Sequence, residues 1–332
     1  MSSLNVAVVG ATGLVGRKML QVLEERRFPV AELRLLASAR SAGRSMKFNG
    51  KEYTVRKLEP GSFEGVKLAL FSAGAAVSKE FAPAAVRSGA LVIDNSSAFR
   101  MDEGVPLVVP EVNPEEIAKH KGIIANPNCS TIQMVVPLKP LHDRWKIKRL
   151  VIATYQSVTG AGKRALSQLE SELAKEPNPE RKFPHAIAYN VMPQIDVFFE
   201  DGYSREERKM KDETRKILGD GSIRITATCV RVPVVGGHSE AVNVEFERPY
   251  DLDEVRSVLG QTPGVCIQDD VGQSVYPMPI WSHEKDEIFV GRLRRDESIP
   301  NGLNLWIVSD NLRKGAATNA VQIAEAWLKN RH

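Results

Sequence analysis

The spacing of hydrophobic positions divides the first 125 residues into alternating strand-like and helix-like segments. Apolar runs of strand length lie at 5–10, 32–38, 66–73 and 91–97. Amphipathic segments of helix length lie between them, at 13–26 and 75–89. Asn49 and Gly50 sit between strand-like residues, which predicts a hairpin. This alternation is typical of a doubly wound, mostly parallel sheet, so we expect an α/β fold with a Rossmann-type domain.

Beyond residue 128 the strand-like segments become longer and alternate apolar with polar positions. They lie at 149–158, 223–235 and 240–249. Such alternation predicts strands buried on one face, as in antiparallel sheets. We therefore expect an α+β catalytic and dimerisation domain at 128–311, with a mostly antiparallel sheet, after a dinucleotide-binding domain at 1–127. The last segment, 312–332, has helical periodicity, which does not decide whether it packs on the first or on the second domain.

Composition narrows the possible partners. The 332 residues carry a net charge of +4 without a lysine or arginine block, which argues against nucleic-acid binding. Uninterrupted apolar segments stay well short of the roughly 20 residues that span a bilayer, so no membrane contact is expected. The three cysteines, at 129, 229 and 266, show neither CxxC spacing nor companion histidines. This pattern predicts no metal and no disulfide, and it favours a reducing, cytoplasmic setting.

The first strand-to-helix turn, VVGATGLVG, carries candidate cofactor residues. Glycines at 10, 13 and 16 give the spacing GxxGxxG, one position away from the usual dinucleotide fingerprint, but the physical needs are the same. The candidate residues of this turn are Gly10, Thr12, Gly13, Leu14, Val15 and Gly16. The alternative is a plain strand-to-helix turn.

The second strand is followed by residues that favour NADP over NAD. No acidic residue follows Glu32 where a ribose 2′-hydroxyl would be bound. Instead Ser38, Arg40 and Ser41 offer hydroxyl groups and a guanidinium, which suit a 2′-phosphate. The alternative is a solvated basic loop.

Cys129 lies in polar, turn-forming company, in the stretch IIANPNCSTIQ. The chain is expected to turn here and to begin a helix, whose N-terminus stabilises a thiolate. An inert cysteine at a strand end is the alternative. A thiol nucleophile beside a nicotinamide suggests aldehyde chemistry, in which a hemithioacetal gives up hydride and leaves a thioester. His238, after two glycines, is the leading acid/base, although a loop histidine alone is commonly structural.

Seven motifs together resemble the aspartate-semialdehyde dehydrogenase family over almost the whole chain. They are GATGLVG, DNSSAFR, NPNCSTIQ, YQSVTGAGK, EERKM, RVPVVGGHSE and SDNLRKGAATNAVQIAE. The resemblance implies reduction of L-4-aspartyl phosphate to L-aspartate 4-semialdehyde with release of phosphate, through a thioacyl enzyme, in synthesis of lysine, methionine and threonine. It also implies a homodimer.

The resemblance assigns roles to individual residues. Cys129 is the nucleophile, His238 the acid/base, and Gln156 orients the substrate and thioester. Substrate contacts fall to Arg231 for the carboxylate, Glu206 for the ammonium, Arg100 and Lys209 for the phosphate, and Asn128 beside the cysteine. Further cofactor contacts fall to Ser72, Ala73, Gly74, Thr159, Gly160 and Asn311. Without the family, Glu206 and Lys209 are only an i, i+3 pair on an exposed helix.

Two other functions fit parts of the pattern. N-acetyl-γ-glutamyl-phosphate reductase uses the same chemistry, but its cysteine typically follows glycine in NPGCYPT, whereas Asn128 precedes the sulfur here. A catalytically silent NADP-binding relative would have lost Cys129 or His238, and both are present. Pro137 and Pro140 predict that the helix from Cys129 is kinked or short. Cys229 and Cys266 are interpreted as structural.

Overall fold

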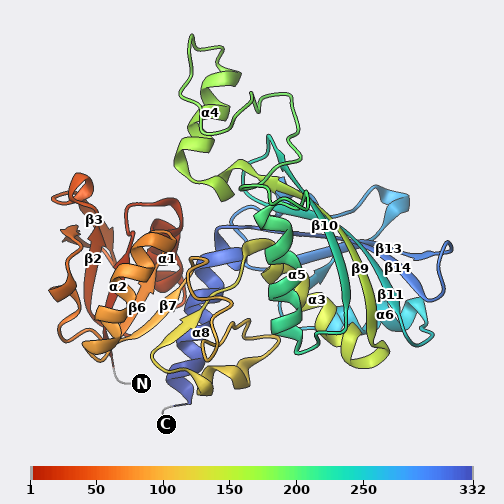
Figure 1. The fold of residues 1–332 in the computed structure, drawn as a ribbon, viewed down its shortest axis with the longest axis horizontal. Coiled ribbons are helices and arrows are strands. Elements are labelled where there is room, and N and C mark those ends of the chain that lie inside the picture. Colours follow the sequence, from red (N-terminus) through yellow and green to blue (C-terminus); the bar gives the residue numbers. More distant parts are fainter. Residues whose placement is uncertain (1–2, 331–332) are drawn as a thin grey trace. The chain divides into compact units, whose positions relative to one another are not determined.

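The structure is a computed structural model that describes residues 3–330. It consists of two compact units, one formed by residues up to Asn128 with those from Ala316 onward, and the other by Cys129–Gly315. Figure 1 shows the elements of each unit. Within residues 3–330, no helix combines the length and the apolar character needed to cross a membrane.

The first unit contains a six-stranded parallel sheet. Its strands, in spatial order, are β5 (Arg56–Lys57), β2 (Val30–Ala37), β1 (Leu4–Val9), β6 (Leu68–Phe71), β7 (Leu91–Asp94) and β8 (Ile123–Ala125). Counting these parallel strands along the chain gives the order 3-2-1-4-5-6, which is that of the Rossmann fold. The predicted α/β class is confirmed.

Apolar runs form these strands because both faces of the sheet are buried. Alternate side chains of β1 enter two separate cores: Val6 and Val8 pack with α1 (Leu14–Glu25) and α8 (Thr318–Lys329), whereas Ala7 and Val9 pack with α2 (Ala75–Arg87). The C-terminal helix α8 thus belongs to the core of the first unit. A π-helix, Arg313–Ala317, leads into it.

Smaller elements complete the first unit. Strands β3 (Ser45–Phe48) and β4 (Lys51–Thr54) form the predicted hairpin, and Asn49 and Gly50 take φ values of +49° and +73°, as a type I′ turn requires. Three 3₁₀-helices lie at Ala39–Ser41, Pro60–Phe63 and Pro114–Lys119.

The second unit contains a six-stranded mixed sheet. Its strands, in spatial order, are β10 (Arg224–Val232), β9 (Ile147–Ser157), β11 (His238–Phe246), β14 (Gly302–Ser309), β13 (Ile288–Asp296) and β12 (Val265–Ile267). The central strands pair antiparallel, as predicted, while the two edge strands run parallel to their neighbours.

Helices pack on this sheet and project from it. They are α3 (Cys129–Trp145), α4 (Lys163–Leu173), α5 (Arg205–Leu218), α6 (Leu252–Gln261) and α7 (Pro279–Ser282), with 3₁₀-helices at Val158–Ala161 and Val271–Gln273. Contacts join α3 to β9, β11 and β14, and α5 to β10. Figure 1 shows α4 and the adjoining chain projecting from one end of the sheet.

Of the two expectations for the helix after Cys129, kinked or short, the second is wrong. Helix α3 runs for 17 residues and contains both Pro137 and Pro140. An interior proline costs about 3 kcal/mol through a lost hydrogen bond and a clash. Most side chains of α3 are buried against the sheet and α5, and this burial outweighs the two prolines.

Candidate active site

Three neighbouring strands of the second unit place three predicted site residues in one row. Arg231 on β10 pairs in register with Gln156 on β9. His238 on β11 lies level with Gln156, because the next residue, Ser239, pairs with Tyr155. Side chains at one register position point to the same face of a sheet. All three are buried, on the face that carries α3 and α5.

Gln156 links this row to helix α5. Its side-chain oxygen accepts a hydrogen bond from Thr154 Oγ1 at 3.0 Å, and its Nε2 donates to Glu206 Oε1 at 3.1 Å. Glu206 Oε2 lies 3.0 Å from Lys209 Nζ. Glu206 is only 4% exposed, so the alternative of an exposed surface pair is wrong for it. The capping box of Ser204 and Glu207 begins α5 here and holds Glu206 in its first turn.

Arg231 is a buried cation whose hydrogen-bond donors are not all used. Its side chain is 5% exposed, Nη1 donates to the Ser157 carbonyl at 2.6 Å, and Nε meets no acceptor among residues 3–330. Burial lowers the pKa of Arg231, while the charges of Glu206 and Cys129 act to raise it. A guanidinium fork with unused donors is suited to a carboxylate.

His238 is completely buried, and the backbone fixes its tautomer. The Ser157 N–H donates to Nδ1 at 3.0 Å. Burial, followed by the charge of Arg231, lowers the pKa of His238 to about 3, so the ring is neutral near pH 7. A neutral ring whose Nδ1 accepts a hydrogen bond carries its proton on Nε2. That nitrogen has no partner among the described residues and can donate to a sulfur or oxygen atom.

Cys129 is the first residue of α3, where helix N–H groups favour a thiolate. Gly315, in the π-helix, packs against it closely: a Cβ atom added at 315 would lie 3.0 Å from the Cβ of Cys129. Cys129 is partly exposed, whereas Cys229 is fully buried in β10, where burial raises its thiol pKa. Cys266 lies in the edge strand β12.

The three cofactor residues predicted in the second unit lie together. Thr159 Oγ1 is 3.0 Å from Asn311 Oδ1 and 2.8 Å from Ser157 Oγ. Gly160 is packed against the row of Arg231, Gln156 and His238, because a Cβ added there would lie 3.1 Å from both Arg231 Nη1 and His238 Nε2.

Gly160→Ala is therefore expected to lower turnover by about tenfold, because the new methyl group displaces the ring of His238 or the guanidinium of Arg231. The measurement is kcat of each variant, and thermal unfolding checks that each variant is folded. Gly221→Ala is the matched control, since a Cβ there meets nothing within 4 Å. Equal turnover of both variants would contradict the close packing.

In the first unit, the predicted cofactor residues lie at the carboxyl ends of β1, β2 and β6. Gly10 has a φ of +83°, and a Cβ there would lie 2.9 Å from the backbone carbon of Ser72. A Cβ at Gly16 would lie 2.2 Å from the Gly10 oxygen. These two contacts bring together the turns that hold Gly10, Thr12, Gly13, Leu14, Val15, Gly16, Ser72, Ala73 and Gly74. Helix α1 begins there without a side-chain cap, which leaves N–H groups for a pyrophosphate.

The other candidates of this unit lie at two strand ends. Ser38 and Arg40 are exposed directly after β2, whereas Ser41 is buried. Arg100 is 7% exposed and held by two carbonyl groups: its Nε donates to Asn126 at 3.0 Å and its Nη2 to Asn95 at 2.8 Å. Asn128 is also buried.

Sequence reasoning missed the residues that hold the row in place. Ser157 binds both His238 and Arg231, Thr154 binds Gln156, and Gln133 Nε2 donates to the His238 carbonyl at 3.3 Å. Their roles depend on strand pairing, which a single sequence does not encode locally. Only polar residues at core-facing positions of α3 and β9 could have pointed to them.

A group of three possible metal ligands occurs among the described residues, namely His283, Glu284 and Asp310. Asp310 Oδ2 accepts from the Glu284 N–H at 2.9 Å and lies 3.2 Å from His283 Nδ1. These contacts hold the loop before β13.

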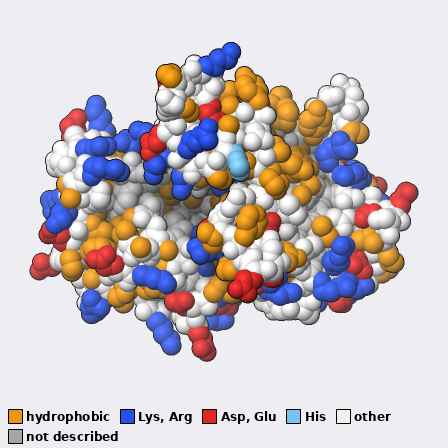
Figure 2. All heavy atoms as spheres, turned by 45° about the horizontal axis from the view of Figure 1, so that its top comes forward, with side chains coloured by type: hydrophobic (Ala, Val, Ile, Leu, Met, Phe, Trp, Pro, Cys, Tyr) orange, Lys and Arg blue, Asp and Glu red, His pale blue; other side chains and the backbone are white. Residues whose placement is uncertain are grey.

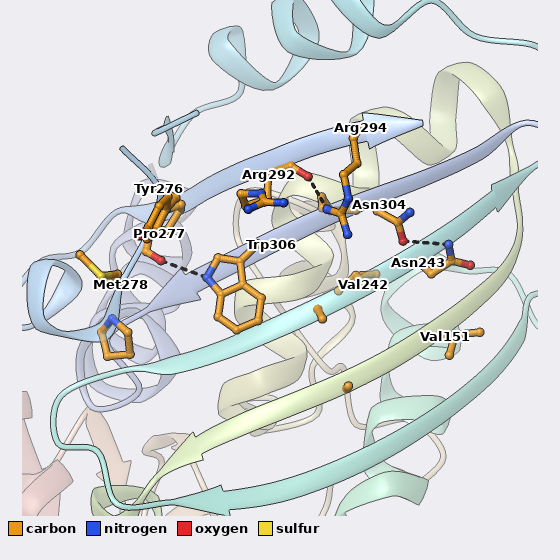
Figure 3. Close-up of a pocket in the computed structure, with 14 residues that line it drawn as sticks. Val151, Val242, Asn243, Tyr276, Pro277, Met278, Arg292, Arg294, Asn304 and Trp306 are labelled. Carbon is orange, nitrogen blue, oxygen red and sulfur yellow. Dashed lines mark hydrogen bonds between the residues drawn. The ribbon is translucent and has the colours of Figure 1, made fainter. Parts of the chain in front are cut away.

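The opposite face of the second sheet carries a hollow of about 610 Å³. Figure 3 shows Trp306 at its centre, with its indole N–H donating to the Pro277 carbonyl at 3.0 Å. None of the predicted catalytic residues lines it. On the face drawn in Figure 2, hydrophobic side chains gather beside the segment that carries α4. Exposed apolar residues of this unit include Tyr189, Phe198, Tyr276, Ile280 and Trp281.

Comparison with known proteins assigns both parts of the chain to described families. Residues 5–120 match the family described as "Semialdehyde dehydrogenase, NAD binding domain", and residues 138–314 match "Semialdehyde dehydrogenase, dimerisation domain".

Individual relatives match over nearly their whole length. The chain is 57% identical over 332 residues to an aspartate-semialdehyde dehydrogenase from Aquifex aeolicus and 50% identical over 338 residues to one from Bacillus subtilis, covering 98% of both chains in each case. Among solved structures it is similar to aspartate semialdehyde dehydrogenase II of Vibrio cholerae complexed with ASA, with a TM-score of 0.96, 49% identity and full coverage of both chains. The enzyme of Candida albicans with NADP gives a TM-score of 0.77 at 26% identity, with 99% coverage of both chains.

Proposed function

The chain belongs to the aspartate-semialdehyde dehydrogenase family, and from this we propose that it reduces L-4-aspartyl phosphate to L-aspartate 4-semialdehyde with release of phosphate. The observation that carries the proposal is the row of Arg231, Gln156 and His238 on the face that also holds the helix beginning at Cys129. The product serves synthesis of lysine, through diaminopimelate, and of methionine and threonine.

In this direction the Cys129 sulfur attacks the acyl phosphate carbon, and the C–O bond to phosphate breaks to leave a thioester. NADPH, when bound, supplies the hydride that reduces the thioester. The C–S bond then breaks, and the thiolate of Cys129 leaves at the N-terminus of α3, which stabilises its charge. His238 assists this departure by donating a hydrogen bond from Nε2.

The same geometry bears on the reverse role of His238 as a base. To accept the thiol proton, Nε2 must be unprotonated. The single N–H proton of the neutral ring must then be on Nδ1. The Ser157 N–H already points at Nδ1 and opposes that tautomer. This hydrogen bond therefore supports His238 as a donor more directly than as a base.

Different charged and amide side chains bind different groups of the substrate. Arg231 holds the carboxylate, Glu206 the ammonium, and Gln156 donates to the reacting carbonyl. Arg100 and Lys209 bind the phosphate, and Asn128 contacts the substrate beside Cys129.

The test is turnover with two aldehydes. The protein is incubated with NADP, phosphate and either L-aspartate 4-semialdehyde or N-acetyl-L-glutamate 5-semialdehyde, and NADPH is followed by absorbance. We expect turnover with the first aldehyde alone. Turnover with only the second aldehyde would identify the chain as an N-acetyl-γ-glutamyl-phosphate reductase. Inactivity with both aldehydes would indicate a catalytically silent relative. The matched relatives do not favour either alternative.

Cofactor choice is proposed to rest on Arg40, whose exposed guanidinium follows β2 beside Ser38. Arg40→Ala is expected to raise the KM for NADPH by about tenfold and to change that for NADH little, because only NADPH carries the 2′-phosphate. Lys47→Ala, an exposed lysine on β3, is the control for net charge. Equal effects on both nucleotides would count against a 2′-phosphate site.

We also propose a homodimer in the cytoplasm, where Cys129 stays reduced. Residues 138–314 match a dimerisation domain, and the open face of the second sheet presents the hollow around Trp306. A second copy seated there would cover this apolar surface. Analytical ultracentrifugation should give a dimer at micromolar concentration and a monomer for Trp306→Asp. A wild-type monomer would overturn the proposal.

A further inference from the structure

The row of Arg231, Gln156 and His238 rests on a second row of buried residues. One pleat further along the same three strands, Cys229 pairs with Thr154, and Thr154 pairs with Glu240. Thr154 donates to Gln156 and so joins the two rows. Glu240 lies two residues after His238 on β11, and its side chain therefore points to the same face.

Glu240 is a carboxyl group without a counter-charge. It is 0% exposed, and no lysine, arginine or histidine among residues 3–330 forms an ion pair with it. The side chains that interact with it belong to Ser130 and Gln133 of α3. Burial raises the pKa of Glu240 well above its ordinary value, and these two neighbours lower it by less. Burial without a counter-charge therefore favours the neutral carboxylic acid over the carboxylate.

Protonation turns Glu240 from an acceptor into a donor. In the described part of the chain neither oxygen of Glu240, nor the buried Oε1 of Gln133, has a hydrogen bond of normal geometry, although the side chains of Ser130 and Gln133 lie close enough to interact with the carboxyl group. An ionised carboxylate and an amide oxygen are both acceptors and cannot bond to each other, whereas a carboxylic acid donates to an amide oxygen. The amide nitrogen of Gln133 donates onward to the His238 carbonyl. Gln133 lies one turn after Cys129, so the chain of bonds would run from the strand of His238 to the helix of Cys129 and back.

We propose that Glu240 is a positioning residue that acts as a neutral carboxylic acid, donating to Gln133 and thereby fixing the N-terminal turn of α3 against β11. It sets the sulfur of Cys129 relative to the Nε2 of His238 without touching substrate. This inference deepens the proposed function and rests on it for the identity of the reaction. The comparable acid at the far end of β11, Glu245, is paired with Lys148 and Arg224, and these partners lower its pKa.

The first test determines whether the carboxyl group of Glu240 is protonated. An infrared difference spectrum of the wild-type protein against Glu240→Gln at pH 7 should show a carboxylic-acid C=O band and no carboxylate band. Glu245→Gln is the matched control on the same strand and should show carboxylate bands only. A carboxylate signal from Glu240 would overturn the proposal.

The second test measures positioning. Glu240→Leu should slow alkylation of Cys129 by iodoacetamide by about tenfold and lower kcat by about tenfold to a hundredfold at unchanged KM. Glu240→Gln keeps the size, the neutral state and an N–H donor, and should restore both rates to within about threefold. Loss of activity in Glu240→Gln equal to that in Glu240→Leu, or normal alkylation in Glu240→Leu, would overturn the proposal. Thermal unfolding of each variant confirms that it is folded.

Alkylation needs neither aldehyde nor nucleotide, so this result stands apart from the proposed reaction. If wild-type protein fails with both aldehydes but the alkylation and infrared results hold, the reaction is wrong and the role of Glu240 is retained. If the wild type turns over and both Glu240 readouts fail, only the role of Glu240 is lost.

Discussion

Cys129→Ala is expected to reduce turnover by about 10⁴-fold or more, because the alanine variant has no sulfur to form the thioester. The second readout is the adduct itself. With aspartate semialdehyde and NADP but no phosphate, the wild-type protein should accumulate an acyl group on the peptide containing Cys129, detectable by mass spectrometry. The variant should form none.

The chain provides its own control for this substitution. Cys266→Ala makes the same chemical change at a partly exposed cysteine in the edge strand β12 and should leave turnover and adduct unchanged. Cys129→Ser tests the nucleophile itself, because a hydroxyl of similar size is far less ionised. Activity above about 1% in Cys129→Ala, or an adduct on another residue, would contradict the assignment.

Local patterns predicted the first unit well because its elements are determined locally. The apolar run of β1, the glycine turn after it and the amphipathic α1 follow one another within about 25 residues, and the Asn49-Gly50 turn needs only two residues in the left-handed region. Helix α3 is the counterexample. Its two prolines predict a kinked or short helix. The helix is not short, because burial of most of its side chains depends on strands that come later in the sequence.

The candidate site was predictable as a set of residues and not as an arrangement. The residues of the row, Gln156, Arg231 and His238, are 75 to 82 positions apart in the chain counted from Gln156, and only strand register makes them neighbours. Reasoning on residue types gave Cys129 and His238. It overlooked Glu240, although a charged residue two positions after His238 in a core-facing alternation is a visible anomaly.

Two electrostatic effects act on the candidate site residues of the second unit, namely the helix N-terminus at Cys129 and the burial of His238 and Arg231. The N-terminus of α3 supports a negative sulfur, while burial keeps His238 neutral and leaves Arg231 a cation with unused donors. A buried cation without a full set of acceptors is costly unless a ligand completes it. This is the reason to expect that a substrate carboxylate gains more from Arg231 than from an exposed arginine.

Arg231→Leu is accordingly expected to lower kcat/KM for aspartate semialdehyde by about 10³-fold, or about 4 kcal/mol, because the proposed binding mode loses two charge-assisted hydrogen bonds to the carboxylate. Arg231→Lys keeps the positive charge but loses the guanidinium fork, so its kcat/KM should lie between those of the wild type and Arg231→Leu. Arg224→Leu is the matched control, since it makes the same change at an exposed position of the same strand.

A second substrate separates recognition from structure. Arg231 Nη1 also donates to the carbonyl of Ser157, whose N–H holds His238, so the substitution alone could act by moving the histidine. With 3-aminopropanal, which lacks the carboxylate, the wild-type protein should already be slow, and Arg231→Leu should reduce its kcat/KM by less than about tenfold. The same 10³-fold loss with both aldehydes would show that Arg231 supports the site and does not bind the carboxylate.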